Sequence, residues 1–173
     1  MSFANEGLMR TMTRDDLKSV LAWRNHPDVR RYMYTQHEIS RAEHTDWFAR
    51  AAEDPQRHLL IFELNDAPMG FVNLHQIAPG AIADWGFYLT PDAPKGTGQK
   101  LGNCALNHAF QVLNLHKVCG QAIEYNDRSV RFHLRMGFQQ EGLLQDHHFD
   151  GEKYHNVVCF GLLAAQWQAT NER

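Results

Sequence analysis

The sequence is poor in cysteine, in long apolar runs and in excess charge, and each shortage excludes a class of protein. Its three cysteines, Cys104, Cys119 and Cys159, show no C-x-x-C spacing, so we expect buried, reduced thiols in a cytoplasmic protein and not a disulfide framework. No apolar run approaches the about 20 residues of a membrane span, and the first residues lack the apolar segment of a secretory signal. The 17 basic and 20 acidic side chains give a net charge of −3, which predicts no bulk attraction to nucleic acid or to a membrane surface.

The 11 histidines also lack the spacing of a metal site. The densest group is His147, His148 and His155, and adjacent residues of an extended strand point to opposite faces of the sheet. His147 and His148 are therefore not expected to bind one ion together. No H-x-x-x-H pair or Cys–His cluster is present, so we predict no metal site.

A chain of 173 residues has the size of one domain, and we predict a single domain over residues 1–173. Ser40 and Glu43 form a capping box before an expected helix that ends at Ala52. The polar pair Asn65-Asp66 predicts a hairpin turn. Strand patterns alternate with helix patterns, which predicts an α/β fold with a mixed sheet and helices on both faces. Strands are expected at 8–11, 57–64, 69–76, 83–90, 117–124, 139–146 and 154–162, and helices at 13–23, 27–33, 40–52, 98–113 and 127–136.

The most informative segment runs from Trp85 through a Pro- and Gly-containing loop into a helix pattern. The loop contains Lys95-Gly-Thr-Gly98. Two glycines at the start of a helix leave several backbone N–H groups aimed at one place, where the helix dipole also favours an anion. This geometry suits a pyrophosphate, although glycines in loops also serve simply to make turns.

A second motif follows the next expected strand, from Asn126 to Phe138. Together the two segments resemble the acyl-CoA-binding core of the GCN5-related N-acetyltransferases (GNAT). The resemblance implies a mostly antiparallel central sheet that splays between its fourth and fifth strands, with acetyl-CoA bound mainly by residues 83–138 and the acceptor mainly by residues 8–76. Two positions depart from the family pattern: Ala93 replaces a basic residue or Gln that often opens the loop, and His133 occupies a position that often carries Tyr.

The resemblance also assigns roles along the cofactor. The strand bonds the pantetheine arm, the glycine loop holds the pyrophosphate, and the Asn-x-x-Ser segment borders the thioester. The cofactor-binding residues implied in this way are Phe87, Tyr88, Leu89, Lys95, Gly96, Thr97, Gly98, Gln99, Lys100, Asn126 and Ser129.

The N-terminal part contains the run Trp23-Arg-Asn-His-Pro27 and, further on, Met33-Tyr34 and the pair His44 and Trp47. These features resemble the PseH-type acetyltransferases of bacterial pseudaminic acid biosynthesis. That resemblance implies acetyl transfer to the 4-amino group of UDP-4-amino-4,6-dideoxy-N-acetyl-β-L-altrosamine, for a sugar that decorates flagellin. It allows a homodimer and leaves the oligomeric state open.

A nucleotide sugar needs an aromatic platform, a cation and hydrogen-bonding side chains. Met33, Tyr34 and Trp47 are expected to sandwich the uracil, Arg24 to hold phosphate oxygens, and His44 to line the same site. For single residues, packing in the core or a solvated ion pair is the alternative explanation, and it is preferred for Trp23 and Phe48.

The reaction needs a base for the ammonium and an acid for the departing thiolate. The resemblance places His133 beside the sulfur, where an imidazole can act as general acid, and the alternative is a histidine that is satisfied within its helix. His75 and Tyr88 are expected to orient the amine, and a backbone N–H near Phe87–Leu89 to stabilise the oxyanion. The base stays unassigned.

Three other functions fit the same segments. A related enzyme would acetylate a different nucleotide sugar, or a polyamine or protein N-terminus. A polyamine site would favour clustered acidic groups, whereas the stretch 24–47 brings Arg24, Arg30 and Arg31 close to aromatic side chains. A non-catalytic acyl-CoA-binding module is the third alternative.

Overall fold

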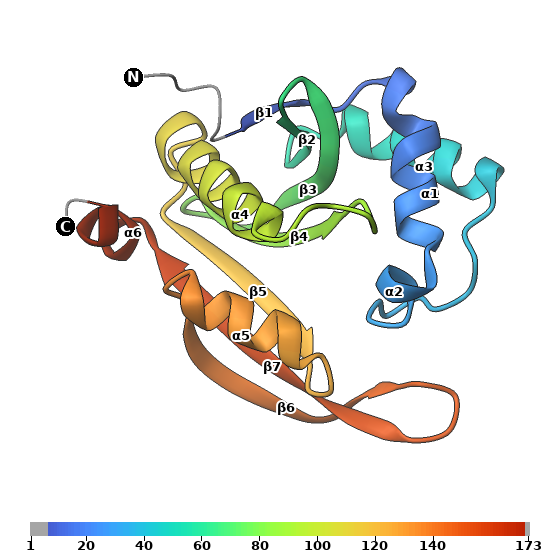
Figure 1. Ribbon diagram of the computed structural model, residues 1–173. Coiled ribbons are helices and arrows are strands. Elements are labelled where there is room, and N and C mark those ends of the chain that lie inside the picture. The colour runs from blue at the N-terminus through green and yellow to red at the C-terminus, as the bar shows by residue number, and fades with distance from the viewer. Residues whose placement is uncertain (1–6, 172–173) are drawn as a thin grey trace.

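The computed structural model describes residues 7–171 and contains a seven-stranded sheet (Figure 1). The strands lie in the order β1-β2-β3-β4-β5-β7-β6. Neighbouring strands are antiparallel except β4 and β5, which are parallel. The sheet is therefore mixed and mostly antiparallel, as predicted. The strand bounds are β1 Leu8–Thr11, β2 Arg57–Leu64, β3 Ala67–Ala78, β4 Ile82–Leu89, β5 Lys117–Ile123, β6 Gln139–Phe149 and β7 Tyr154–Leu163.

Helices cover both faces of this sheet (Figure 1). On one face, α4 packs on β1, β2 and β3, and α5 packs on β5 and β6. On the other face, α3 packs on β2 and α1 packs on β4. The helix bounds are α1 Leu17–Asn25, α2 Pro27–Arg30, α3 Arg41–Glu53, α4 Thr97–Asn107, α5 Asp127–Arg135 and α6 Ala164–Asn171, with a 3₁₀ turn η2 Arg14–Asp16 and a π-helical turn η3 His108–Val112.

Each face of the sheet has its own buried core. The larger core lies under α4 and α5 and includes Trp85, Leu101, Phe132 and Phe160. The smaller core lies under α1 and α3, and its members are Met12, Val20, Trp23, Phe48, Ala51, Leu59, Ile61 and Phe71. Trp23 and Phe48 are thus core residues, as the sequence predicted. Following the regions that the resemblance implies, we name the face under α1 and α3 the acceptor face and the opposite face the cofactor face.

Local signals in the sequence placed most element boundaries. The capping box of Ser40 and Glu43 is present, and the Ser40 Oγ accepts from the Glu43 amide at 3.1 Å. Asn65 and Asp66 form the β2–β3 turn, both with positive φ. α6 was not predicted, because its sequence has no apolar repeat and Trp167 is its buried residue. The helix expected over 98–113 is α-helical only to Asn107.

The predictions on membrane spans and on cysteine burial can also be compared with the structure. Among residues 7–171, no helix is long and apolar enough to span a membrane. Cys104, Cys119 and Cys159 form no disulfide bond within residues 7–171, and each is half-buried where full burial was expected.

Candidate active site

The sheet splits between β4 and β5. Pairing between these strands covers Ile82, Ala83 and Asp84 of β4, and it ends with Asp84 opposite Cys119. Beyond that point β4 continues to Leu89 along β3, while β5 continues to Ile123 along β7. The two strands diverge (Figure 1), and the facing edge of β4 from Trp85 onward keeps main-chain groups for a ligand.

The glycine loop lies at the far end of this divergent stretch of β4. Gly96 caps α4 with φ +90°, and a Cβ built there meets no atom within 4 Å. The Thr97 hydroxyl donates to the Pro94 carbonyl at 2.7 Å, so the Thr97 side chain has its hydrogen bond within the loop. Gly98 lies beside the end of β4, since a Cβ built on it is 3.6 Å from Leu89 Cδ1. The first amides of α4 thus open next to the strand, which is the arrangement expected for a pyrophosphate site.

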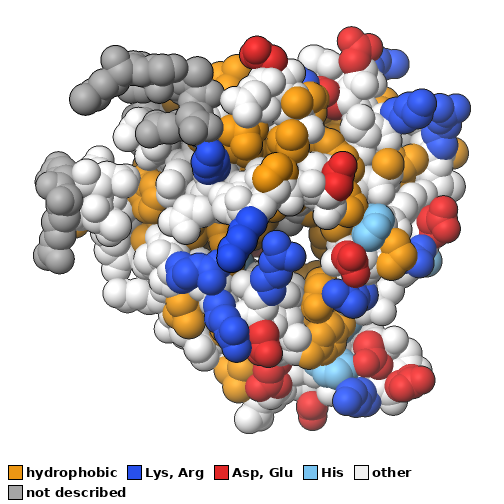
Figure 2. All heavy atoms as spheres, in the orientation of Figure 1, with side chains coloured by type: hydrophobic (Ala, Val, Ile, Leu, Met, Phe, Trp, Pro, Cys, Tyr) orange, Lys and Arg blue, Asp and Glu red, His pale blue; other side chains and the backbone are white. Residues whose placement is uncertain are grey.

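Lys and Arg side chains gather on the surface in front of α4 and α5 (Figure 2). Arg128, Arg131 and Arg135 are exposed on α5 at helical spacing, and Lys95 is exposed in the glycine loop. This positive surface favours the phosphate groups of a cofactor bound at the loop.

His133 is enclosed on the cofactor face and is only 1% exposed. Its Nε2 accepts a hydrogen bond from Trp85 Nε1 at 3.0 Å, and its Nδ1 donates to the Ser129 carbonyl at 2.8 Å. The ring stacks on Phe160 with a centroid distance of 4.7 Å and an interplanar angle of 6°. Burial lowers the pKa of His133. This geometry favours the satisfied structural histidine over the general acid that the motif led us to expect.

The Asn126–Ser129 segment also has a local structural role. The Asn126 side chain caps α5 by accepting from the Ser129 amide at 3.2 Å. The Ser129 hydroxyl lies 3.5 Å from His133 Nδ1. Ser129 stands next to the buried Trp85–His133 pair, and contact of Asn126 and Ser129 with the thioester stays a prediction.

On the acceptor face, the end of the β4–β5 pairing is marked by an acidic residue that the sequence analysis missed. Asp84 is directly opposite His75 on β3 and opposite Cys119 on β5. Although the Asp84 side chain is exposed, desolvation by the surrounding protein raises the pKa of its carboxyl, and His75 acts in the opposite direction. Alternation along β4, with Trp85 apolar and buried, would have placed Asp84 on the acceptor face.

Three buried polar atoms lack a hydrogen-bond partner in the described part of the chain: Arg24 Nη1, His44 Nε2 and Asn73 Oδ1. They come from α1, α3 and β3, and all three side chains belong to the acceptor face, since Asn73 alternates with the core residue Phe71. Burial lowers the pKa of Arg24 and of His44, and the neighbouring Arg24 lowers that of His44 further. Burial also raises the pKa of Tyr88, against the influence of Arg24.

The connection between α2 and α3, residues 31–39, forms a strap across this face. Asn25 holds one end through two hydrogen bonds with the Ile39 backbone, each 2.8 Å, and Arg24 Nη2 donates to the Thr35 carbonyl at 2.8 Å. At its middle, the Tyr34 hydroxyl donates to Gln121 Oε1 on β5 at 2.7 Å. The strap therefore joins α1 to β5 above the point where the strands part.

Tyr34, in the strap, and Trp47, on α3, were expected to enclose one base, but they lie apart. The Tyr34 ring lies 5.5 Å from that of His148, whereas Trp47 stacks on His44 at 5.2 Å and meets Phe71 edge-on at 5.9 Å. Tyr34 and Trp47 thus pack on different parts of the sheet, and the structure does not hold them as a sandwich. Met33 is half-buried in the strap.

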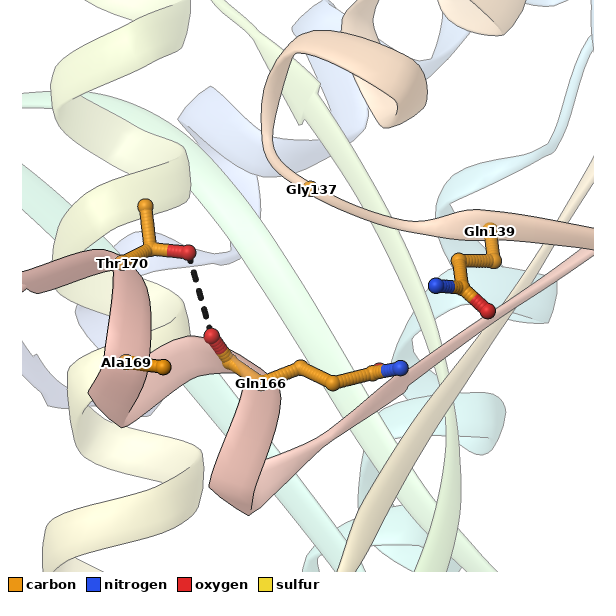
Figure 3. Close-up of a pocket in the computed structure, with 5 residues that line it drawn as sticks. All are labelled: Gly137, Gln139, Gln166, Ala169 and Thr170. Carbon is orange, nitrogen blue, oxygen red and sulfur yellow. Dashed lines mark hydrogen bonds between the residues drawn. The ribbon is translucent and has the colours of Figure 1, made fainter.

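A surface hollow elsewhere is lined by Gly137, Gln139, Gln166, Ala169 and Thr170 (Figure 3). Its lining consists of amide and small side chains with no ionisable group, and it lies between the start of β6 and one side of α6. In residues 7–171, no group of three or more His, Cys, Asp or Glu side chains is placed to hold a metal ion.

Comparison with known proteins gives the site its context. Residues 8–139 match the model of the acetyltransferase (GNAT) domain. The chain is 24% identical over 174 residues to a spermidine N(1)-acetyltransferase of Escherichia coli K12, covering 99% of this chain and 94% of that protein. It is 26% identical over 152 residues to the acetyltransferase PseH of Campylobacter jejuni, covering 86% and 87%.

The fold is also that of a solved acetyltransferase. The spermidine N-acetyltransferase of Vibrio cholerae, crystallised with CoA and spermine, superposes with a TM-score of 0.87 at 23% identity, over 94% of this chain and 98% of that one. The split sheet, the glycine loop and the family match agree with one another, and the chain belongs to the GNAT family as an acetyl-CoA-dependent N-acetyltransferase.

Proposed function

We propose that the acceptor is the 4-amino group of a UDP-amino-dideoxy sugar, such as UDP-4-amino-4,6-dideoxy-N-acetyl-β-L-altrosamine. The observation that supports this most is the set of three unpartnered buried polar atoms, Arg24 Nη1, His44 Nε2 and Asn73 Oδ1, on one face of the sheet. A buried donor or acceptor without a partner costs about 1–3 kcal/mol, so such a set favours a ligand that supplies the missing partners. The hydroxyl, carbonyl and phosphate oxygens of a nucleotide sugar do so.

The positive charge of Arg24 also favours a nucleotide sugar over a polyamine. Arg24 has a donor that is buried and unpartnered, and Arg24 stays protonated despite its burial. It needs an oxygen acceptor and repels a cation. The similarity to PseH, at 26% identity, agrees with this assignment.

Acetyl-CoA is placed on the opposite side of β4. Main-chain groups of Phe87, Tyr88 and Leu89 bond the pantetheine arm, and the loop from Lys95 to Lys100 holds the pyrophosphate. The acetyl group then lies where pairing between β4 and β5 ends, next to Asp84. An amine bound on the acceptor face reaches the thioester carbonyl at that point.

Asp84 removes the first proton. A carboxylate with a raised pKa is the stronger base, and His75, directly across from it, keeps the carboxylate available. The neutral amine attacks the carbonyl carbon, a C–N bond forms, and a main-chain N–H of β4 stabilises the oxyanion. The C–S bond then breaks. The nitrogen loses its second proton as it becomes an amide, and the thiolate takes up one proton, so the reaction balances without a proton from His133. Tyr88, held neutral beside Arg24, orients the amine.

A polyamine is the second candidate. It is favoured by the match to spermidine N(1)-acetyltransferase, which covers 99% of the chain, and by the acidic Asp84 at the reaction point.

Thiol release from acetyl-CoA with each acceptor distinguishes the candidates. We expect release with UDP-4-amino-dideoxy sugars and little with spermidine or N-terminal peptides. Arg24→Gln should lower kcat/KM for the sugar by about 10–100-fold through the lost charged hydrogen bond, while the matched change of the exposed Arg14 leaves it unaltered. Preference for spermidine would reject the proposal in favour of the polyamine, and no thiol release with any amine would favour a non-catalytic acyl-CoA-binding module.

A further inference from the structure

A second hollow, on the acceptor face, has a composition that the proposed function does not yet use. It lies where α3 leads into β2, measures about 260 Å³, and is lined by Trp47, Arg50, Ala51, Asp54 and Arg57. Pockets that enclose a whole small ligand measure about 300–1,000 Å³. This hollow is therefore sized for one end of a longer ligand.

The hollow is connected to the reaction point by the register of the sheet. Arg57 on β2 is opposite His75 on β3, and His75 is opposite Asp84 on β4. Directly paired residues of antiparallel strands point to the same face. Arg57, His75 and Asp84 thus form one row, and two strand spacings, about 10 Å, separate its ends. A ligand with its amine at Asp84 extends along this row to Arg57.

The side chains of the hollow suit an anion attached to a flat ring. Arg57 pairs with Asp54 through Nε at 3.4 Å, which orients its guanidinium and leaves the Nη groups as donors. Arg50 is exposed one helical turn beyond Trp47, and the two arginines outnumber the one carboxylate. The indole of Trp47 stacks on His44 on one side, and the half-buried Trp47 side chain also lines the hollow, where it can contact a base.

We propose that this hollow binds the nucleoside diphosphate end of the acceptor. Arg50 and Arg57 bind the phosphate oxygens, and the open face of Trp47 stacks on the base. This inference rests on the proposed function and extends it, since it moves the diphosphate from Arg24 to the far end of the row. Arg24, His44 and Asn73 are then left for the sugar ring.

The test is calorimetric titration of UDP into protein saturated with CoA, so that the cofactor's own pyrophosphate site is filled. We expect the double variant Arg50→Gln/Arg57→Gln to bind UDP at least about tenfold more weakly than the wild type, since charged hydrogen bonds are lost. Arg41→Gln, an exposed change in the first turn of the same helix, should bind as the wild type does. Trp47→Ala should weaken UDP and leave inorganic pyrophosphate unaffected.

The outcomes separate this inference from the function beneath it. If UDP binds both the wild type and the double variant equally, while Arg24→Gln weakens it, the acceptor is a nucleotide sugar and the hollow is not its phosphate site. If UDP fails to bind the CoA-saturated wild type and spermidine binds, both the hollow assignment and the nucleotide-sugar function are wrong. A loss of UDP affinity confined to the double variant and Trp47→Ala, in protein whose circular dichroism matches the wild type, supports the hollow.

Discussion

Trp85 on β4 donates its indole N–H to Nε2 of His133 on α5, at 3.0 Å, inside the cofactor-face core. The bond links the strand that parts from β5 to the helix that follows β5. Because His133 also donates from Nδ1 to the Ser129 carbonyl, the ring has one defined tautomer. The proton position of this histidine is therefore set by packing.

The first prediction concerns this pair. His133→Phe keeps an aromatic ring but leaves the buried Trp85 indole N–H without its acceptor. We expect the free energy of unfolding to fall by about 1–3 kcal/mol, while kcat of the folded fraction stays within about threefold of the wild type. Urea unfolding and steady-state turnover measure the two effects. A loss of about a hundredfold in kcat with unchanged stability would instead restore His133 as the general acid.

The second prediction concerns pH. Burial lowers the pKa of His133, His44 and His108 in the folded protein, whereas an unfolded histidine titrates near pH 6.5. As the pH falls below about 6.5, the unfolded chain takes up protons that the folded chain does not. The free energy of unfolding should therefore be at its full value near pH 7.5 and fall towards pH 5. Urea unfolding across this range tests the slope, which should be shallower in His133→Phe. A free energy of unfolding that does not change between pH 7.5 and pH 5 would contradict the lowered pKa values of these histidines.

The third prediction concerns the base. Asp84→Asn keeps the shape of the side chain and removes its proton acceptor, so kcat should fall by about a hundredfold or more. The acidic limb of the pH–rate profile, which reports titration of a carboxyl with a raised pKa, should disappear with it. CoA titration serves as the control and should give an unchanged affinity. A variant that retains the wild-type rate and acidic limb would exclude Asp84 as the base.

The fourth prediction concerns the glycine loop. Gly96 has φ +90° and open space at its Cβ, and Gly80, away from the loop, has φ +86° and equally open space. Valine at either position strains the backbone to a similar extent. Of these two variants, only Gly96→Val should weaken CoA, because a side chain at Gly80 does not approach the cofactor. Gly98 does not have a positive φ, so Gly98→Val should weaken CoA only by crowding the bound cofactor. Equal CoA affinity in Gly80→Val and Gly96→Val would reject the cradle.

The sequence predicted the sheet, most of its helices and the glycine loop before α4, because these depend on local patterns. Alternation defined the strands, Ser40 and Glu43 marked a helix start, and two glycines marked the loop. The acceptor side depends on cross-strand register, which local patterns do not show. The row from Arg57 through His75 to Asp84 depends on this register and was not predicted, although alternation alone would have placed Asp84 on the acceptor face. Asn25 belongs to the Trp23–Pro27 motif, but its two hydrogen bonds to the Ile39 backbone in the strap were not predicted.

His133 shows what a sequence motif leaves out. The motif correctly placed it on α5, but a motif does not report what surrounds a side chain. The surroundings include Gly120, on β5, where a Cβ would come within 2.6 Å of His133 Nε2 and 2.7 Å of Trp85 Nε1. The missing side chain at Gly120 is what lets the two rings meet.

The short pairing between β4 and β5 has a consequence for how the protein opens. Three residue pairs join the first four strands to the last three, so few main-chain bonds hold the two halves of the sheet together. A cofactor that bonds the free edge of β4 and touches α5 bridges the seam. Amide hydrogen exchange in β4 and β5 should therefore slow when CoA is added. On this account, a bound cofactor stabilises the contact between the two halves of the sheet in addition to donating the acetyl group.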